Sequence, residues 1–110
     1  MAVIFKSLNT GDINPGASKN VEWTADKDYT IKAVVLNERN DYSLSPVKAY
    51  VSIEDRVKTK DYVPARIIGQ DLEYCWKPDE KITAGTRIYF KFENAGANTL
   101  NIDVTLVLEE

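Results

Sequence analysis

The C-terminal part of the chain alternates apolar and polar residues in two runs that a short turn separates. From 88 to 93, and again from 100 to 108, every even-numbered position is Ile, Phe, Leu or Val. A period of two places alternate side chains on opposite faces of a strand, so each run predicts a β-strand with one buried face. The residues between them, Asn94-Ala-Gly-Ala-Asn98, are typical of a turn. We interpret the whole segment as one antiparallel β-hairpin that belongs to a sheet with one covered face.

Shorter apolar runs, separated by Pro, Gly, Asn and Asp, predict further strands along the rest of the chain. Residues 29–37 are apolar on both faces, which predicts a central or covered strand, and the polar connection 38–46 is long enough to cross between sheets. Pro64 cannot donate a ladder hydrogen bond, so it belongs on an edge strand or at the start of a strand. The strands expected before the terminal pair are 1–8, 21–24, 29–37, 47–54, 63–68 and 72–76, with a loop over 9–16.

These patterns predict an all-β fold, because no segment of helical spacing interrupts the strands. One sheet cannot bury its apolar face alone, so two sheets must face each other. We expect a two-sheet antiparallel β-sandwich of about eight strands, jelly-roll-like. An immunoglobulin-like sandwich would need a cysteine pair, and the chain has one cysteine, Cys75. Residues 1–110 are expected to form a single domain, with residues 1–16 as an N-terminal arm or as a first strand plus loop.

Composition narrows the classes of function. The chain has 14 Lys and Arg against 17 Asp and Glu, with the signs interspersed, so we expect no nucleic-acid partner. No apolar run approaches about 18 residues and no signal-peptide pattern opens the sequence, so we expect no membrane segment and no secretion. Histidine is absent, which removes the commonest general base and zinc ligand. We expect no enzymatic activity, no cofactor and no metal.

Two groups of acidic residues are candidate sites. Asp26 and Asp28 could offer carboxylates to calcium, but the remaining ligands of a calcium loop are missing. The acidic residues of 71–73 and 79–80 could serve as the paired acids of a glycosidase, which need a deep cleft between them. A small sandwich has little room for such a cleft, so we interpret both groups as solvated turns.

Tyrosines are the more informative polar side chains. Tyr50 and Tyr89 are out of phase with the inward residues of their strands, so they are predicted on the outer face. Aromatic rings on an outer face can contact another subunit, support a second packed layer or stack on a sugar ring. We favour contact or packing over sugar stacking, and sugar stacking over mere exposure. Tyr42 and Tyr62 are further candidates for an interface or for ligand stacking.

Trp23 and Trp76 are in phase with apolar neighbours and are predicted in the core. Cys75 lies next to Trp76 on the opposite face of its expected strand. Without a histidine to activate it, this thiol is interpreted as structural. The basic residues of 56–60 are flanked by acidic residues and are interpreted as a solvated, mobile loop.

Several short features occur from Tyr62 onward: Tyr62-Val-Pro64, the strand expected over Leu72–Trp76, Pro78-Asp-Glu80, Ile82-Thr-Ala-Gly85, Phe92-Glu-Asn94 and Asn101-Ile-Asp-Val-Thr105. On these features, this part of the chain resembles small jelly-roll structural proteins of phages and archaeal viruses, such as capsid decoration, spike and fibre-head domains.

This resemblance implies a non-enzymatic virion structural protein, assembled in the host cytoplasm, that self-associates and docks on other virion proteins. A homo-oligomer is expected, with a trimer favoured, and the outward tyrosines and the N-terminal arm would contact neighbouring subunits. The alternative is a carbohydrate-binding β-sandwich module with an aromatic platform, so a glycan is a second expected partner.

Overall fold

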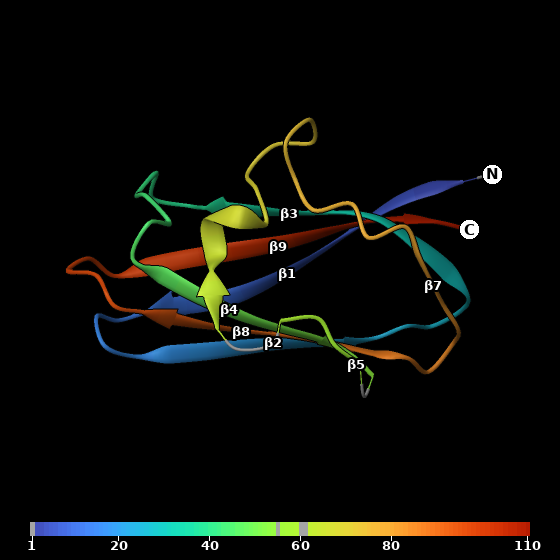
Figure 1. Ribbon diagram of the computed structural model, residues 1–110, viewed down its shortest axis with the longest axis horizontal. Coiled ribbons are helices and arrows are strands. Elements are labelled where there is room, and N and C mark those ends of the chain that lie inside the picture. The colour runs from blue at the N-terminus through green and yellow to red at the C-terminus, as the bar shows by residue number, and fades with distance from the viewer. Residues whose placement is uncertain (1, 55, 60–61) are drawn as a thin grey trace.

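The computed structural model describes residues 2–54, 56–59 and 62–110, which form two antiparallel β-sheets packed face to face (Figure 1). We call the four-stranded sheet sheet A and the other sheet B. In spatial order, the strands of sheet A are β1 (Val3–Ile13), β9 (Leu100–Glu109), β3 (Tyr29–Glu38) and β7 (Glu80–Ile82).

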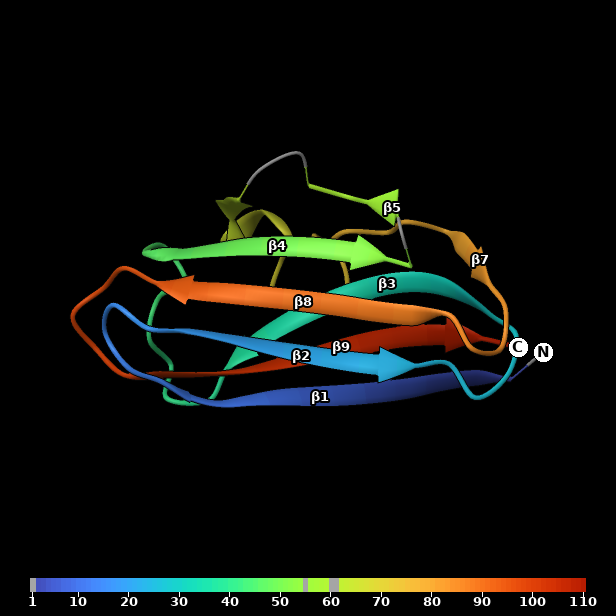
Figure 2. The same ribbon diagram turned by 90° about the horizontal axis from the view of Figure 1, so that it is seen from below.

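Sheet B contains β2, β8 and β4 side by side, with two very short strands along the outer edge of β4 (Figure 2). A single turn of 3₁₀-helix, η1 (Ala65–Ile67), follows the second of these short strands. The strands of sheet B are β2 (Ser18–Thr24), β8 (Arg87–Asn94), β4 (Val47–Ile53), β5 (Arg56–Val57) and β6 (Val63–Pro64).

The strand order is that of a jelly roll. From β1 to β4, and again from β7 to β9, each successive strand lies in the sheet opposite to its predecessor. The result is the order β1-β9-β3-β7 in one sheet and β2-β8-β4-β5 in the other, which nests two Greek keys. The predicted all-β sandwich is therefore confirmed. Residues 38–46 cross between the sheets, as expected.

The terminal hairpin, in contrast, was predicted wrongly. β8 pairs with β2 and β4, whereas β9 pairs with β1 and β3, so residues 95–99 cross from one sheet to the other. Alternation determines which face of a strand is buried but not which strand lies beside it. A five-residue connection can join neighbouring strands about 4.8 Å apart or sheets about 10 Å apart.

The buried Asn94 shapes this crossing. Its Nδ2 donates to the carbonyl of Ile13 at 2.9 Å and to that of Asn98 at 2.7 Å, and its Oδ1 accepts from the Gly96 amide at 2.9 Å. These bonds satisfy backbone groups that an open arch would leave without partners.

The core confirms the predicted pattern of inward residues. Every even-numbered position of the two terminal strands is buried, and the rings of Phe90 and Phe92 stack with their centroids 6.3 Å apart. The predicted inward residues of β4 are also buried: Val47, Ala49, Val51 and Ile53.

The first strand is longer than predicted. β1 continues through the expected loop at 9–12, where its pairing with β9 shifts register between Asn9 and Asp12. Gly11, with a φ of 71°, makes this bulge possible. The turn at 14–16 is present, and residues 3–13 form a strand within sheet A rather than a free arm.

The expected strand at 72–76 is absent. The Asp71 carboxylate accepts the backbone N–H groups of Glu73 at 3.0 Å and Tyr74 at 2.8 Å, and this turn replaces an extended backbone. Leu72 and Tyr74 are consequently 55% and 75% exposed. Sequence reasoning also missed two short strands, β5 and the three-residue β7, which Pro78 precedes.

Residues 68–80 cover the outer edge of β3, which was predicted to be central or covered. The Val34 amide donates to the Trp76 carbonyl and the Leu36 amide to the Gly69 carbonyl, both at 2.9 Å. Gly69 has a φ of 102°, and a Cβ there would lie 2.2 Å from the Tyr74 carbonyl oxygen, so only glycine fits. Within the part of the chain that the structure describes, no helix is long and apolar enough to cross a membrane.

Candidate functional site

Three of the four candidate tyrosines meet on the outer face of sheet B. The ring centroid of Tyr50 lies 6.0 Å from that of Tyr62 and 6.2 Å from that of Tyr89, within the range of favourable tilted and edge-to-face contacts. We call these three residues the tyrosine cluster. Tyr62 is 37% exposed, and the other two rings are half-buried.

Strand register explains how the cluster forms. Tyr89 lies opposite Ser52, and Tyr50 lies opposite Lys91, so the two tyrosines are diagonal neighbours on one face of the β4–β8 pair. The pairing of β6 with the other edge of β4 brings Tyr62 alongside. The sequence predicted the outward placement of Tyr50 and Tyr89, but the position of Tyr62 depends on this edge pairing.

Charged side chains of both signs surround the tyrosine cluster. Lys91 lies beside Tyr62, and a hydrogen bond to the Tyr62 side chain is the main reason that the pKa of Lys91 is raised above its ordinary value. Glu22 lies opposite Tyr89 on β2, and Lys48 lies opposite Glu93 on β4 and β8. An aromatic centre with a charged rim is the usual anatomy of a protein interface.

Tyr42 is not part of this cluster. It lies at one end of the sandwich, beside the crossing at 95–99, where it lines a shallow depression with Pro46 and Leu100. Its backbone amide donates to the carboxylate of the buried Glu38, and its ring is 43% exposed. The structure therefore separates Tyr42 from the other three candidates.

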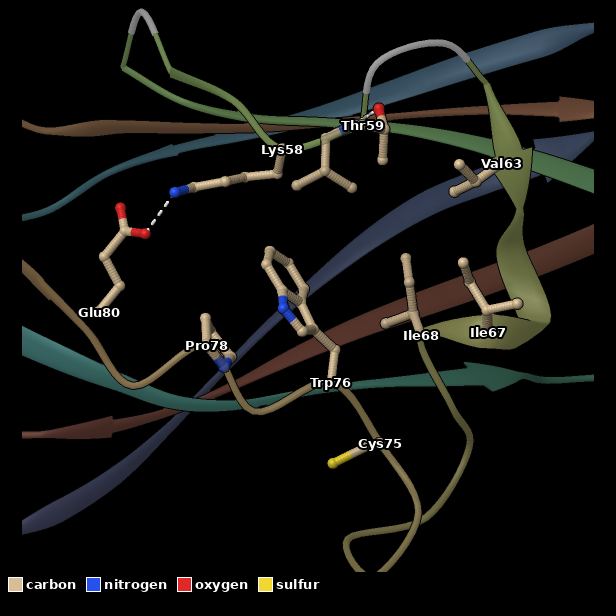
Figure 3. A pocket seen from close by; sticks show the side chains of 10 residues that line it. Lys58, Thr59, Val63, Ile67, Ile68, Cys75, Trp76, Pro78 and Glu80 are labelled. Atoms are coloured by element: carbon tan, nitrogen blue, oxygen red, sulfur yellow. Dashed lines mark hydrogen bonds and ion pairs between the residues drawn. The ribbon is translucent and has the colours of Figure 1, made fainter.

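A second candidate site is a pocket of about 450 Å³ beside the outer edge of β4 (Figure 3). Its walls come from β4, from 58–59, from 63–68 and from 75–80, so they connect the edge of sheet B to the edge of sheet A. We call it the Trp76 pocket. Its lining residues are Val51, Lys58, Thr59, Val63, Ile67, Ile68, Cys75, Trp76, Pro78 and Glu80.

Backbone hydrogen bonds hold Trp76 in place from both sides. Its amide donates to the Ile68 carbonyl at 2.7 Å, and its carbonyl accepts from Val34 on β3. The ring packs against the core, as does that of Trp23 on β2, but both tryptophans are only partly buried, so they flank the core rather than lie within it as predicted. The Trp76 ring also lies in the pocket (Figure 3).

An ion pair crosses one end of the pocket. The Lys58 Nζ lies 2.5 Å from the Glu80 carboxylate, and the two side chains are 26% and 16% exposed (Figure 3). The Lys58 amide donates to the Val51 carbonyl, while Glu80 pairs with Ile31 on β3, so the ion pair links the two sheets. Of the predicted solvated strip at 56–60, Lys58 thus has a partner, and Lys60 lies outside the described residues.

The acidic candidates make local structural contacts. Asp26 accepts a hydrogen bond from the Tyr29 hydroxyl at 2.8 Å, which lowers the pKa of Asp26, and Asp28 accepts from the Ala84 amide at 2.9 Å. Asp79 pairs with Lys32 at 2.5 Å. Among the described residues no group of three or more Asp, Glu or Cys is placed to hold a metal ion.

Cys75 is a partly buried free thiol at the lower margin of the pocket, with its Sγ 3.7 Å from the Leu72 carbonyl (Figure 3). Sequence reasoning missed the pocket because its residues come from three separate segments. Lys58 and Glu80 were interpreted as solvated, and no spacing in the sequence links them to Trp76.

No protein-family model, no curated protein and no solved structure matches this chain. The function must therefore be inferred from the tyrosine cluster and the pocket themselves.

Proposed function

We propose that this protein is a non-enzymatic structural component of a virus particle that self-associates and docks on other virion proteins. The observation that carries the proposal is the tyrosine cluster on the outer face of sheet B. The jelly-roll strand order supports a virion role, because the segment from Tyr62 onward resembles jelly-roll structural proteins of phages and archaeal viruses. The proposed location is accordingly the virion.

The tyrosine cluster suits an interface because its rings are already held in place. Tyr50 and Tyr89 are fixed by their strands and by contact with each other, so docking would cost little side-chain entropy. Tyrosine contributes a large apolar area together with a hydroxyl that can hydrogen-bond to a partner. Such residues are over-represented among those that dominate binding energy.

The charged rim suits contact between copies of the same chain. Lys48 and Lys91 are positive, whereas Glu22 and Glu93 are negative, and all four lie on the outer face of sheet B. A neighbouring copy can therefore meet each charge with its opposite. We propose a closed oligomer, with a trimer favoured by the resemblance, whose repeated contacts also strengthen docking on the particle through avidity.

Light scattering coupled to size-exclusion chromatography tests this proposal. The wild-type chain is expected to have the mass of an oligomer, and the double variant Tyr50→Ala/Tyr89→Ala that of a monomer. Phe5→Ala is the matched control, since Phe5 is an aromatic residue 62% exposed on β1, on the outer face of sheet A. A wild-type chain that stays monomeric at high concentration contradicts the proposal, as does an oligomer that only Phe5→Ala dissociates.

A further inference from the structure

We propose that the Trp76 pocket binds a neutral sugar ring. This inference goes beyond the proposed function, because the pocket lies beside the edge of β4 and does not include the tyrosine cluster. It therefore requires no self-association.

The pocket has the size and rigidity of a small-molecule site. A volume of about 450 Å³ is within the range usual for ligand pockets. Two backbone hydrogen bonds fix Trp76, and the fit of Gly69 against Tyr74 closes the loop behind it. A site that is already formed loses little entropy when a ligand enters.

The chemistry of the walls is amphipathic. The indole of Trp76 lies among the aliphatic side chains of Val63, Ile68 and Pro78 (Figure 3). A pyranose offers a face of C–H groups that packs against such an aromatic surface, and a rim of hydroxyl groups that remains to be hydrogen-bonded. The apolar wall therefore fits one side of the sugar ring.

The polar end of the pocket fits the other side. Lys58 donates, and the Glu80 carboxylate accepts, so hydroxyl groups of a sugar can bond to both. The Thr59 hydroxyl accepts from the Val51 amide at 3.2 Å and can still donate its own proton. The ion pair at one end of the pocket and the Thr59 hydroxyl on another part of its wall would orient the ring.

The charges of the pocket favour a neutral sugar over a charged one. Lys58 and Glu80 neutralise each other at 2.5 Å, so the pocket carries no net charge from its lining residues. A ligand carboxylate or ammonium would have to compete with one member of this half-buried pair. Breaking such a pair leaves the other charge without compensation.

Nuclear magnetic resonance of the two tryptophan indole N–H groups provides the test. The chain has two tryptophans, and Trp23→Phe assigns the signal of Trp76. Methyl glycosides of glucose, galactose, mannose and N-acetylglucosamine are titrated to tens of millimolar, beside glucuronate, glucosamine and cyclohexanol. We expect at least one neutral glycoside to shift the Trp76 signal saturably while the Trp23 signal stays in place.

Two variants that retain Trp76, and therefore its indole signal, test the contribution of the polar lining residues. Lys58→Met removes a donor and is expected to weaken glycoside binding about tenfold, equivalent to about 1.4 kcal/mol. Lys77→Met is the matched control, because Lys77 donates to the Glu73 carbonyl and does not line the pocket. Thr59→Val is the second variant: it replaces the Thr59 hydroxyl with a methyl group of the same shape and should also weaken glycoside binding.

Any outcome other than the expected one overturns the proposal. These outcomes are no Trp76 shift with any neutral glycoside, tighter binding of glucuronate or glucosamine, and binding of cyclohexanol alone, which would indicate an apolar partner. Equal weakening by Lys58→Met and Lys77→Met would also exclude the pocket. Because the oligomer mass is measured separately, failure here leaves the proposed assembly role intact.

Discussion

The outer faces of the two sheets differ in where their side chains find partners. On sheet A, the Asp103 carboxylate accepts hydrogen bonds from the Nε and an Nη of Arg39, at 2.9 and 3.0 Å, and from the Nδ2 of Asn9 at 2.9 Å. Asn37 adds a longer contact of 3.4 Å. On sheet B, the tyrosine cluster makes contacts mainly among its own rings and presents them to solvent.

This difference indicates which face gains more from a partner. A polar network whose groups already hydrogen-bond to one another gains little free energy when a partner excludes water, because its hydrogen bonds are already made. Half-exposed aromatic rings gain free energy from each apolar area that a partner covers. We therefore propose the tyrosine cluster, rather than the Asp103 network, as the docking surface.

The largest effect on stability is expected from a substitution at Glu38, where the connection between the sheets begins. Glu38 is buried, and its carboxylate accepts the backbone N–H groups of Asn40, Tyr42 and Asn101 at 2.7–2.9 Å. Glu38→Ala leaves three donors without this acceptor and is expected to cost about 3 kcal/mol in urea unfolding. The exposed Glu22→Ala serves as control, and equal losses from the two variants would contradict this role.

The network on sheet A gives the next effect. Asp103→Ala is expected to lower the free energy of unfolding by about 1–2 kcal/mol, a range reduced because Arg39 is exposed and its charge is screened. Asp103→Asn keeps the shape and should retain part of this stability. Neither variant should change the oligomer mass; a change in mass would break the contrast between the faces.

Lowering the pH should also reduce the free energy of unfolding, because it protonates Asp103. The Arg39 guanidinium, with Asn9 and Asn37, holds the pKa of Asp103 below its ordinary value. Its ionised form therefore stabilises the fold above the unfolded-state pKa of about 3.9, and this contribution is lost as pH falls through the lower folded pKa. Urea midpoints should fall between about pH 5 and pH 2, less steeply in Asp103→Asn. Parallel pH profiles would contradict this assignment.

The smallest effect is expected from an exposed ion pair. Lys32 and Asp79 lie 2.5 Å apart, but their side chains are 41% and 69% exposed. Lys32→Ala should change the free energy of unfolding by no more than about 0.5 kcal/mol, and added salt should reduce the difference. A loss as large as that of Asp103→Ala would show that burial does not decide the strength of these contacts.

The sequence pattern predicted which side chains of each strand face the core, but not which strands pair with each other. Alternation correctly predicted the inward residues of β4, β8 and β9 and the outward Tyr50 and Tyr89, because it depends only on neighbouring positions. Whether β8 pairs with β9 depends on contacts far along the chain and on the buried side chain of Asn94. Alternation alone cannot distinguish a hairpin from an arch.

Local hydrogen bonding also overrode an apparent strand pattern. Leu72, Tyr74 and Trp76 alternate as a strand would, yet the Asp71 carboxylate folds the backbone into a turn. The pocket that results depends on this turn, on Gly69 and on an ion pair between distant segments. No short-range pattern could have revealed it.

A concentration series of two-dimensional ¹⁵N–¹H spectra tests the central claim most directly, since it reports on both faces at once. We predict that signals of Tyr50, Tyr89 and Lys91 on sheet B shift or broaden as the concentration rises, while those of Asn37 and Asp103 on sheet A stay unchanged. Changes confined to sheet A, or a spectrum independent of concentration with the mass of a monomer, would contradict the claim that the tyrosine cluster is the assembly surface.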